Sequence, residues 1–145
     1  MTDQQFRAKT WLRRYRDQWN QLDNDRALLL VRANVVNKCT GSYETDGSGC
    51  RDIDAQNGKY QDALADYSEA IRQVEKDEKK LLEIFNEISA AIKQLYDPLL
   101  QKIATDIYLR NMKWAAVQSE EHISKSTLDR KHRDMLTELA KIVKI

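Results

Sequence analysis

Residues 60–95, YQDALADYSEAIRQVEKDEKKLLEIFNEISAAIKQL, carry the pattern that decides the fold. Apolar side chains recur in alternating steps of three and four residues, and only Glu78 interrupts the series. This spacing predicts a long amphipathic helix that begins between Asp54 and Lys59 and ends at Tyr96. Such a helix is unstable alone in water, so its apolar stripe must be buried against a partner. The stripe consists of Tyr60, Leu64, Tyr67, Ile71, Val74, Leu81, Phe85, Ile88, Ile92 and Leu95.

A second stretch, residues 5–38, has the same rhythm and supplies that partner. Only Arg26 breaks its series. Between the two stretches, residues 39–54 are rich in Gly, Ser, Thr and Asp and have no apolar period, which predicts a mobile loop. We therefore expect residues 1–96 to form a long antiparallel helical hairpin, coiled-coil-like in its packing. The apolar seam of the first helix consists of Ala8, Leu12, Tyr15, Trp19, Leu22, Leu29, Ala33 and Val36.

The hairpin alone leaves several apolar side chains uncovered. A second copy of the chain would bury them, so we expect a homodimer formed through the hairpin. The uncovered side chains are Trp11, Leu28, Val35 and Leu82.

The composition agrees with an all-α chain. The 145 residues include one proline, Pro98, and four glycines, all between residues 41 and 58. The net charge is only +1, so any nucleic-acid role must come from local clustering of basic residues. No apolar run is long enough to span a membrane and the N-terminus lacks an apolar signal region, so we expect a cytoplasmic protein without a membrane partner.

The residue types that usually carry catalysis or bind metals form no recognisable pattern. Cys39 and Cys50 are expected to be free thiols in a reducing compartment, with a disulfide that closes the loop as the alternative. They have no nearby histidine and make no zinc site, and the acidic residues of the loop lack calcium-loop spacing. We expect His122 in a turn and His132 on the flank of the last helix, without a nucleophile and carboxylate around either. The sequence therefore predicts no enzyme, no cofactor and no metal.

The C-terminal third reads as three short helices. Asp97 can cap a helix over residues 98–110, which Asn111 ends, and a short helix follows over residues 112–121. Ser124 caps the last helix after a tight turn, so residues 97–145 predict a trihelical helix-turn-helix domain. The side chains expected to point inward are Leu99, Leu100, Ile103, Ile107, Tyr108, Trp114, Ala115, Val117, Leu128, Met135, Leu136 and Leu139.

The outward face of the last helix carries hydroxyl and basic side chains, as a helix that enters the major groove of DNA requires. Between residues 125 and 133 four basic residues stand against one acidic residue, which leaves a local net charge of +3. The alternative interpretation is an ordinary amphipathic surface helix with a solvated basic face. The outward residues are Lys125, Ser126, Thr127, Asp129, Arg130 and Arg133.

Three segments, Leu109–Val117, Ile123–Leu128 and Leu136–Leu139, resemble the region-four helix-turn-helix of bacterial sigma factors. They are closer still to the small phage transcriptional regulators of the ArpU and RinA kind, which also carry a helical region ahead of this motif. The resemblance implies a sequence-specific regulator that binds double-stranded DNA in the bacterial host cytoplasm and controls late packaging or lysis genes. It implies that Trp114 is core. The DNA-facing residues it implies are Lys125, Ser126, Thr127, Asp129, Arg130 and Arg133.

Compared with the sigma pattern, this sequence has fewer basic residues and an acidic Asp129 on the reading face. We therefore expect DNA binding to depend on dimerisation or on bacterial RNA polymerase as a further partner. Lys113 adds a positive charge on the second helix of the motif, which Glu120 and Glu121 offset.

The N-terminal turns are also basic, and an antiparallel hairpin would return them to the neighbourhood of the C-terminal domain. Arg7, Arg13 and Arg14 are therefore candidate phosphate contacts. The other interpretation is a solvated face whose arginine stems cover apolar surface.

Two alternatives to a regulator stay open. A DNA-packaging protein similar to a phage small terminase would also join a helix-turn-helix to an oligomerising helical segment. A coiled-coil protein-interaction module would use the hairpin as its active surface.

Overall fold

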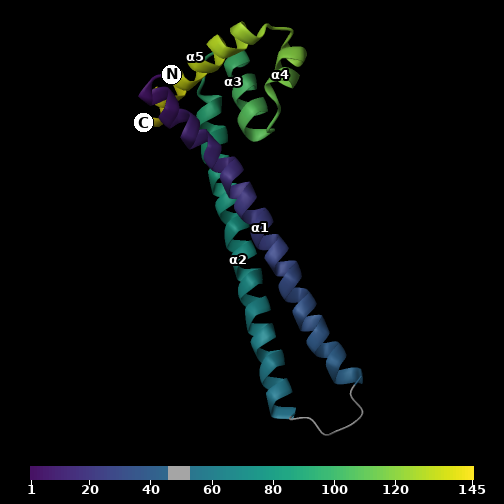
Figure 1. Cartoon of the computed structure of the whole chain (residues 1–145). Coiled ribbons are helices and arrows are strands. Elements are labelled where there is room, and N and C mark those ends of the chain that lie inside the picture. Colours follow the sequence, from purple (N-terminus) through teal and green to yellow (C-terminus); the bar gives the residue numbers. More distant parts are fainter. Residues whose placement is uncertain (46–52) are drawn as a thin grey trace. The chain divides into compact units, whose positions relative to one another are not determined.

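The structure, a computed structural model, describes residues 1–45 and 53–145, and the side chains of residues 1–39 and 57–145. Every element in these residues is helical and none is a strand, which confirms the all-α prediction. The elements are α1 (Asp3–Thr45), α2 (Ile53–Lys93), α3 (Pro98–Ala104), the π-helical turn η1 (Thr105–Leu109), α4 (Trp114–Glu121) and α5 (Lys125–Val143) (Figure 1).

The chain divides into two compact units. The first unit contains residues 1–19 and 80–145, and the second contains residues 20–79. The first turns of α1 and the last turns of α2 therefore belong with the C-terminal helices. The predicted boundary between residues 96 and 97 lies inside the first unit.

Both long helices extend into the predicted loop. α1 continues to Thr45 and α2 begins at Ile53, so the prediction of a loop over residues 39–54 is wrong for the part that the structure describes. Glycine costs a helix about 1 kcal/mol and serine less, and a long helix can accommodate such a penalty. The rest of the predicted loop, residues 46–52, lies outside the described residues.

The cysteine prediction falls partly on the same segment. Cys39 is a half-buried free thiol. Cys50 lies outside the described residues, so its pairing stays a prediction.

α2 ends at Lys93, three residues before the predicted end at Tyr96. The residue before a proline avoids helical backbone angles, so the helix could not have continued through Asp97. Asp97 is extended, with φ −88° and ψ 120°, and its carboxylate accepts a hydrogen bond from the backbone N–H of Leu99 at 2.9 Å. The predicted cap of α3 is therefore present, with the proline in its first turn.

In the second unit, two helical segments pack through small and branched side chains. Arg26 pairs with Glu78 at 3.3 Å, and Arg32 pairs with Asp66 at 3.5 Å. The two residues that interrupted the apolar series, Arg26 and Glu78, are thus partners across this unit. Because the higher-numbered arginine meets the lower-numbered acid, the segments run in opposite directions. The buried apolar side chains of this unit are Leu22, Ala63, Ala70 and Val74.

The first unit holds the larger core. Ala8 and Leu12 of α1 are fully buried against side chains from α2, α3, η1 and α5. A smaller cluster of Ile103, Val117 and Leu128 joins α3, α4 and α5. The four apolar residues predicted for the inner face of α5 are all fully buried, which confirms that face; they are Leu128, Met135, Leu136 and Leu139. On α4, Trp114 is half-buried and Val117 is buried, whereas Ala115 is exposed and its predicted inward position is wrong.

The predicted helix over residues 98–110 changes its winding midway. In η1 the backbone N–H of Arg110 donates to the carbonyl oxygen of Thr105 at 2.9 Å, a five-residue step in place of the usual four. Asn111 then stops the helix in the left-handed region with φ 54°, as predicted. π-turns of this kind often occur at functional sites.

Candidate functional site

A short turn separates α4 from α5. His122 ends α4 in the left-handed region with φ 55°, a conformation that histidine adopts more readily than most side chains. Ser124 then caps α5, because its hydroxyl accepts a hydrogen bond from the backbone N–H of Thr127 at 3.2 Å. The half-buried Ile123 packs on the smaller cluster and anchors the turn. The predicted positions of His122 and Ser124 are therefore confirmed.

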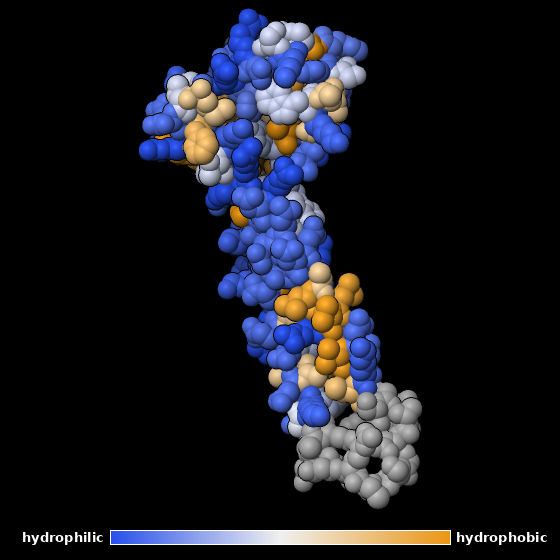
Figure 2. All heavy atoms as spheres, viewed as in Figure 1, coloured by the Kyte–Doolittle hydropathy of each residue, from blue (hydrophilic) through white to orange (hydrophobic). Residues whose placement is uncertain are grey.

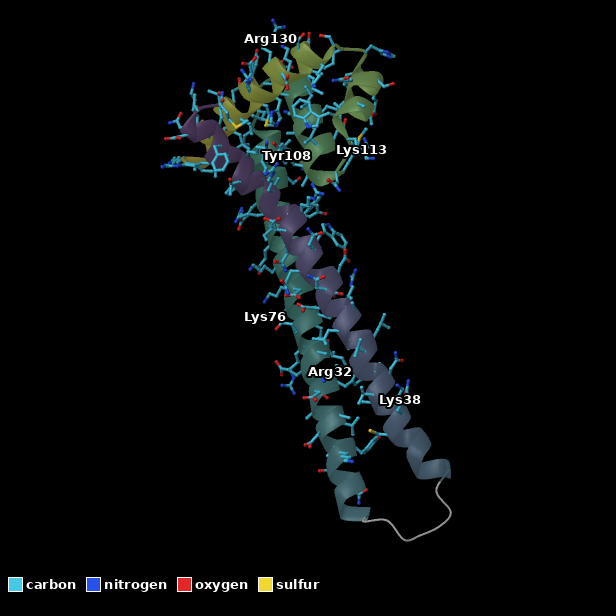
Figure 3. All side chains as sticks on the ribbon, viewed as in Figure 1. Arg32, Lys38, Lys76, Tyr108, Lys113 and Arg130 are labelled. Carbon is cyan, nitrogen blue, oxygen red and sulfur yellow. The ribbon has the colours of Figure 1, made fainter. Side chains whose placement is uncertain are left out.

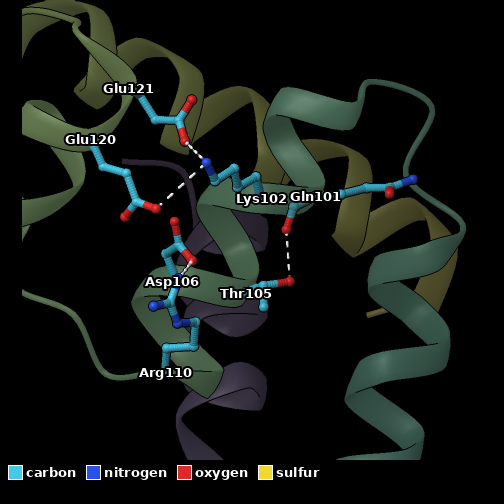
Figure 4. A network of polar contacts seen from close by, with 7 residues as sticks. All are labelled: Gln101, Lys102, Thr105, Asp106, Arg110, Glu120 and Glu121. Atoms are coloured by element: carbon cyan, nitrogen blue, oxygen red, sulfur yellow. Dashed lines mark hydrogen bonds and ion pairs between the residues drawn. The ribbon is translucent and has the colours of Figure 1, made fainter.

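A polar network fixes the C-terminal end of α4 (Figure 4). The ammonium group of Lys102 on α3 lies 2.6 Å from the carboxylate of Glu121 and 3.6 Å from that of Glu120. The neighbouring Glu121 carboxylate raises the pKa of Lys102 above its ordinary value. Lys102 therefore balances one of the two negative charges, and the closer carboxylate, that of Glu121, is its main partner.

The same network ties η1 to the chain that follows it. Arg110 pairs with the buried Asp106 at 2.9 Å, and the backbone carbonyl of Asp106 accepts from the N–H of Met112 at 2.8 Å. The hydroxyl of Thr105 donates to the carbonyl of Gln101 at 2.9 Å (Figure 4). These bonds hold residues 111–113, which lead into α4.

All six predicted DNA-facing residues of α5 lie on its outer side. Lys125, Ser126, Arg130 and Arg133 are exposed, whereas Thr127 and Asp129 are half-buried. Figure 3 shows Arg130 projecting from the outer edge of α5. A cleft of about 460 Å³ on this side is lined by Gln5, Ser126, Asp129, Arg130, Arg133 and Asp134.

The first turns of α1 form one wall of this cleft. The side-chain amide of Gln5 donates to the hydroxyl of Thr137 at 2.9 Å and to the carbonyl of Arg133 at 3.4 Å. The two arginines in the cleft are balanced by Asp129 and by Asp134, an acidic residue that the sequence analysis did not place there. The cleft is therefore close to neutral.

The stronger positive charge lies in a second cavity of the first unit, of about 330 Å³. Four basic residues line it and no acidic residue does. In the described part of the chain, no carboxylate lies within ion-pairing distance of any of the four. The lining consists of Lys9, Arg13, Arg16, Ile107, Tyr108, Asn111, Met112, Lys113, Trp114 and His132.

Three aromatic rings make up much of this lining. The Tyr108 hydroxyl lies 2.7 Å from Nε2 of His132, and the two rings stack at a centroid distance of 5.8 Å. Trp114 meets His132 edge-on at 5.0 Å. Figure 3 marks Tyr108 and Lys113 on two of the contributing elements, η1 and the chain before α4.

His132 is 3% exposed, so its predicted position on the flank of α5 is wrong. His132 follows Leu128 by four residues and precedes Met135 by three, which places it on the inner face of the helix, so the spacing in the sequence was the signal for this burial. Burial, together with the positive charges of Lys9 and Arg13, lowers the pKa of His132 to about 4. Burial also raises the pKa of Tyr108 to about 12. Both groups are therefore uncharged at neutral pH, and the cavity takes its charge from the basic side chains alone.

The predicted N-terminal arginines have different environments. Arg13 lines the cavity together with Lys113, and Arg7 is exposed. Arg14 pairs with Glu87 at 2.9 Å and stacks over the Trp11 ring at 4.9 Å. Arg14 is therefore engaged within the protein, as the alternative interpretation expected for arginines of this face.

Sequence reasoning missed Lys9 and Arg16 as site residues. Their spacing with Arg13, four and then three residues, places all three on one side of a helix. That spacing was the signal that could have grouped them.

Comparisons with protein families, with curated proteins and with solved structures find no match to this chain. Within the described residues, no helix combines the length and the apolar character needed to cross a membrane. The same residues hold no cluster of three or more His, Cys, Asp or Glu side chains placed to bind a metal ion.

Proposed function

We propose that this chain is a sequence-specific DNA-binding regulator, with α4, the turn after it and α5 as a helix-turn-helix and α5 as the recognition helix. The resemblance of residues 109–139 to phage regulators suggests late packaging or lysis genes as targets. In this proposal residues 1–96 form a long hairpin that supports the DNA-binding part. The protein acts in the bacterial cytoplasm, with RNA polymerase as a further partner.

One observation carries the proposal: the N-terminal half of α5 is anchored on one side and free on the other. Leu128 is fully buried and the Ser124 cap fixes the first turn, while Arg130 and Arg133 stay exposed one and two turns further on. A helix presented in this way can lie in the major groove, with its first turns toward the base edges. An arginine there can pair with guanine through two parallel hydrogen bonds.

Backbone contacts supply the affinity in this scheme. Lys125, Ser126 and Thr127 lie at the N-terminal end of α5, where phosphate contacts commonly fix the register of a recognition helix. Arg7, Arg13 and Lys113 are the candidate phosphate contacts from outside α5. The near-neutral cleft beside Arg130 implies that α5 alone binds weakly.

Retention of duplex fragments tests the proposal. The purified protein is incubated with sheared bacterial and prophage DNA, and the retained fragments are sequenced. Enrichment of one site upstream of packaging or lysis genes is expected. Uniform retention, or none at 50 mM salt, would contradict sequence-specific regulation.

The paired variant R130A/R133A separates recognition by α5 from general attraction. We expect loss of most specific binding. If an arginine contacts a base, its removal should weaken the binding free energy by about 1–3 kcal/mol; if it contacts a phosphate, the dependence of log affinity on log salt concentration should become less steep by about one unit. The matched control K79A/K80A removes two exposed lysines of α2 and is expected to bind as the parent does. Equal binding by the parent and R130A/R133A would favour the interaction-module alternative.

An exposed apolar face on the second unit supports a homodimer. Leu28, Val31 and Val35 recur along α1 in steps of three and four and are 45%, 55% and 39% exposed, with Leu30 beside them at 68%. Figure 2 shows this apolar cluster on the surface of the unit. A second copy in antiparallel orientation, centred on Val31, would bury the same stripe from both sides. Lys38 of each copy would then lie near the acidic side chains around Asn24 of the other, since the two positions are equidistant from the centre.

Sedimentation equilibrium tests the dimer. The parent is expected at twice the mass of one chain at micromolar concentration, and V31E at the mass of one chain. K79A/K80A, which removes two exposed lysines of α2, should stay dimeric. A parent with the mass of one chain would refute dimerisation, and a larger ring would favour the DNA-packaging alternative.

A further inference from the structure

We propose that the basic cavity of the first unit is a binding site for a nucleoside polyphosphate. The site lies between the first turns of α1 and residues 107–114 and includes the aromatic group around His132. It is separate from the exposed face of α5, and it does not depend on α5 entering a DNA groove.

The first step is the charge. Lys9, Arg13 and Arg16 follow one side of α1, and Lys113 lies across the cavity from a different element. Four cations without a carboxylate among the lining residues repel one another, and an anion between them would relieve that repulsion. One phosphoryl group carries at most about two negative charges, so the set matches a ligand with more than one phosphate.

The second step is the lining. Trp114 is half-buried in the wall of the cavity, and Tyr108 and His132 stack beside it with an interplanar angle of 17°. Tyr108 and His132 are buried, at 8% and 3% exposure, so Trp114 is the ring that can take up a planar base by stacking. The hydrogen-bonded Tyr108–His132 pair supports Trp114 through the edge contact between Trp114 and His132 at 5.0 Å.

The third step is selectivity. Asn111 is exposed at the cavity and held by the left-handed stop after η1, so its amide can present both a donor and an acceptor to the edge of a base. A volume of about 330 Å³ falls at the small end of the range for ligand pockets, which suits one nucleotide. The absence of a glycine-rich phosphate loop from the sequence means that side chains, rather than backbone N–H groups, would hold the phosphates.

Titration calorimetry of the full chain tests the inference with four probes: ATP, GTP, AMP and inorganic phosphate. A triphosphate is expected to bind at least about tenfold more tightly than AMP, and inorganic phosphate more weakly still. Tryptophan fluorescence should change with the same midpoint, because Trp114 lines the site. In an NMR titration the ring of His132 should respond while that of the exposed His122 does not.

Surface variants localise the site. R13Q/K113Q alters two exposed side chains and is expected to weaken triphosphate binding at least about tenfold. N111D is nearly isosteric and tolerates the same backbone angles, so it should fold normally and weaken binding by charge repulsion. K79Q/K80Q removes the same charge as R13Q/K113Q from α2 and should bind as the parent does.

Four results would overturn the inference. The first is no binding heat with either triphosphate at millimolar concentration, and the second is equal affinity for ATP and inorganic phosphate. The third is triphosphate binding that R13Q/K113Q leaves unchanged. The fourth is binding of duplex DNA that requires Arg13 and Lys113, in a protein that does not bind free nucleotides. The last result would assign the cations to the DNA backbone. Retained nucleotide binding by R130A/R133A is expected, so failure of this site and failure of the proposed DNA function are distinguishable.

Discussion

Acidification should destabilise the first unit through His132. This ring is 3% exposed, and its pKa of about 4 lies below the ordinary value of 6.5. Above pH 6.5 the histidine is neutral in both the folded and the unfolded chain and has no effect on stability. As the pH falls from 6.5 toward 4, the unfolded chain takes up a proton that the folded chain refuses, so folding becomes less favourable.

The size of this effect follows from the separation of the two pKa values. One pKa unit corresponds to about 1.4 kcal/mol, so the full effect below pH 4 is about 3 kcal/mol. At pH 5 the unfolded histidine is almost fully protonated and the folded one is mostly neutral. The expected loss between pH 7.5 and pH 5 is therefore about 2 kcal/mol.

Urea unfolding followed by tryptophan fluorescence measures this loss, because all three tryptophans, Trp11, Trp19 and Trp114, belong to the first unit. The variant H132Q removes the titrating group and keeps a side chain that can bond with Tyr108. Its stability should fall less on acidification than that of the parent, by about 2 kcal/mol.

The control H122Q removes the only other histidine, which is exposed in the turn before α5, and should keep the parental pH dependence. Identical losses for the parent and H132Q between pH 7.5 and pH 5 would refute the argument that His132 is buried in neutral form.

Three further changes test the packing. Leu128→Ala deletes a fully buried side chain from the smaller cluster and should lower the free energy of unfolding by about 2–5 kcal/mol, measured with urea. The control L82A changes a 60% exposed leucine and should stay within about 0.5 kcal/mol of the parent. Similar losses for the two variants would contradict the burial of Leu128. Ser124→Ala removes the cap of α5 and should cost about 1 kcal/mol, with S124D restoring it; a loss that Asp does not restore would mean that the cap is not the cause. R26L/E78L replaces an exposed ion pair, which contributes at most about 1 kcal/mol, by apolar residues that continue the seam. The thermal unfolding temperature should stay the same or rise. A clearly lower unfolding temperature would show that the ion pair contributes more than its exposure implies.

Much of the helical pattern could be read from the sequence because it depends on local spacing. The inner face of α5 and the caps at Asp97 and Ser124 require only a 3.6-residue period and a short polar side chain before it. Arg26 and Glu78 carry opposite charges and each interrupts one of two facing apolar seams. This arrangement could have been used to predict the ion pair between them.

The structural features that could not be predicted depend on contacts between segments far apart in the chain or on helix winding that no local pattern marks. The π-turn η1 has no sequence signature, and without its winding the position of Tyr108 opposite His132 could not be derived. Helix ends were misplaced between residues 39 and 54 because glycine and serine oppose a helix only weakly. The hydrogen-bond partner of His132, Tyr108, and the basic side chains of α1 near it depend on contacts between residues far apart in the chain.

Residues 5–16 of α1 link the two candidate surfaces of the first unit. Ala8 and Leu12 are fully buried, so this segment packs on the same core as α5. Gln5 of the segment lines the cleft beside Arg130, and its basic side chains line the cavity beside His132. A change in the packing of α1 must therefore alter both surfaces, whereas a change at an exposed rim residue alters only one. For this reason N111D and R130A/R133A, which each alter one surface, can separate DNA recognition from nucleotide binding, whereas core substitutions or removal of α1 cannot.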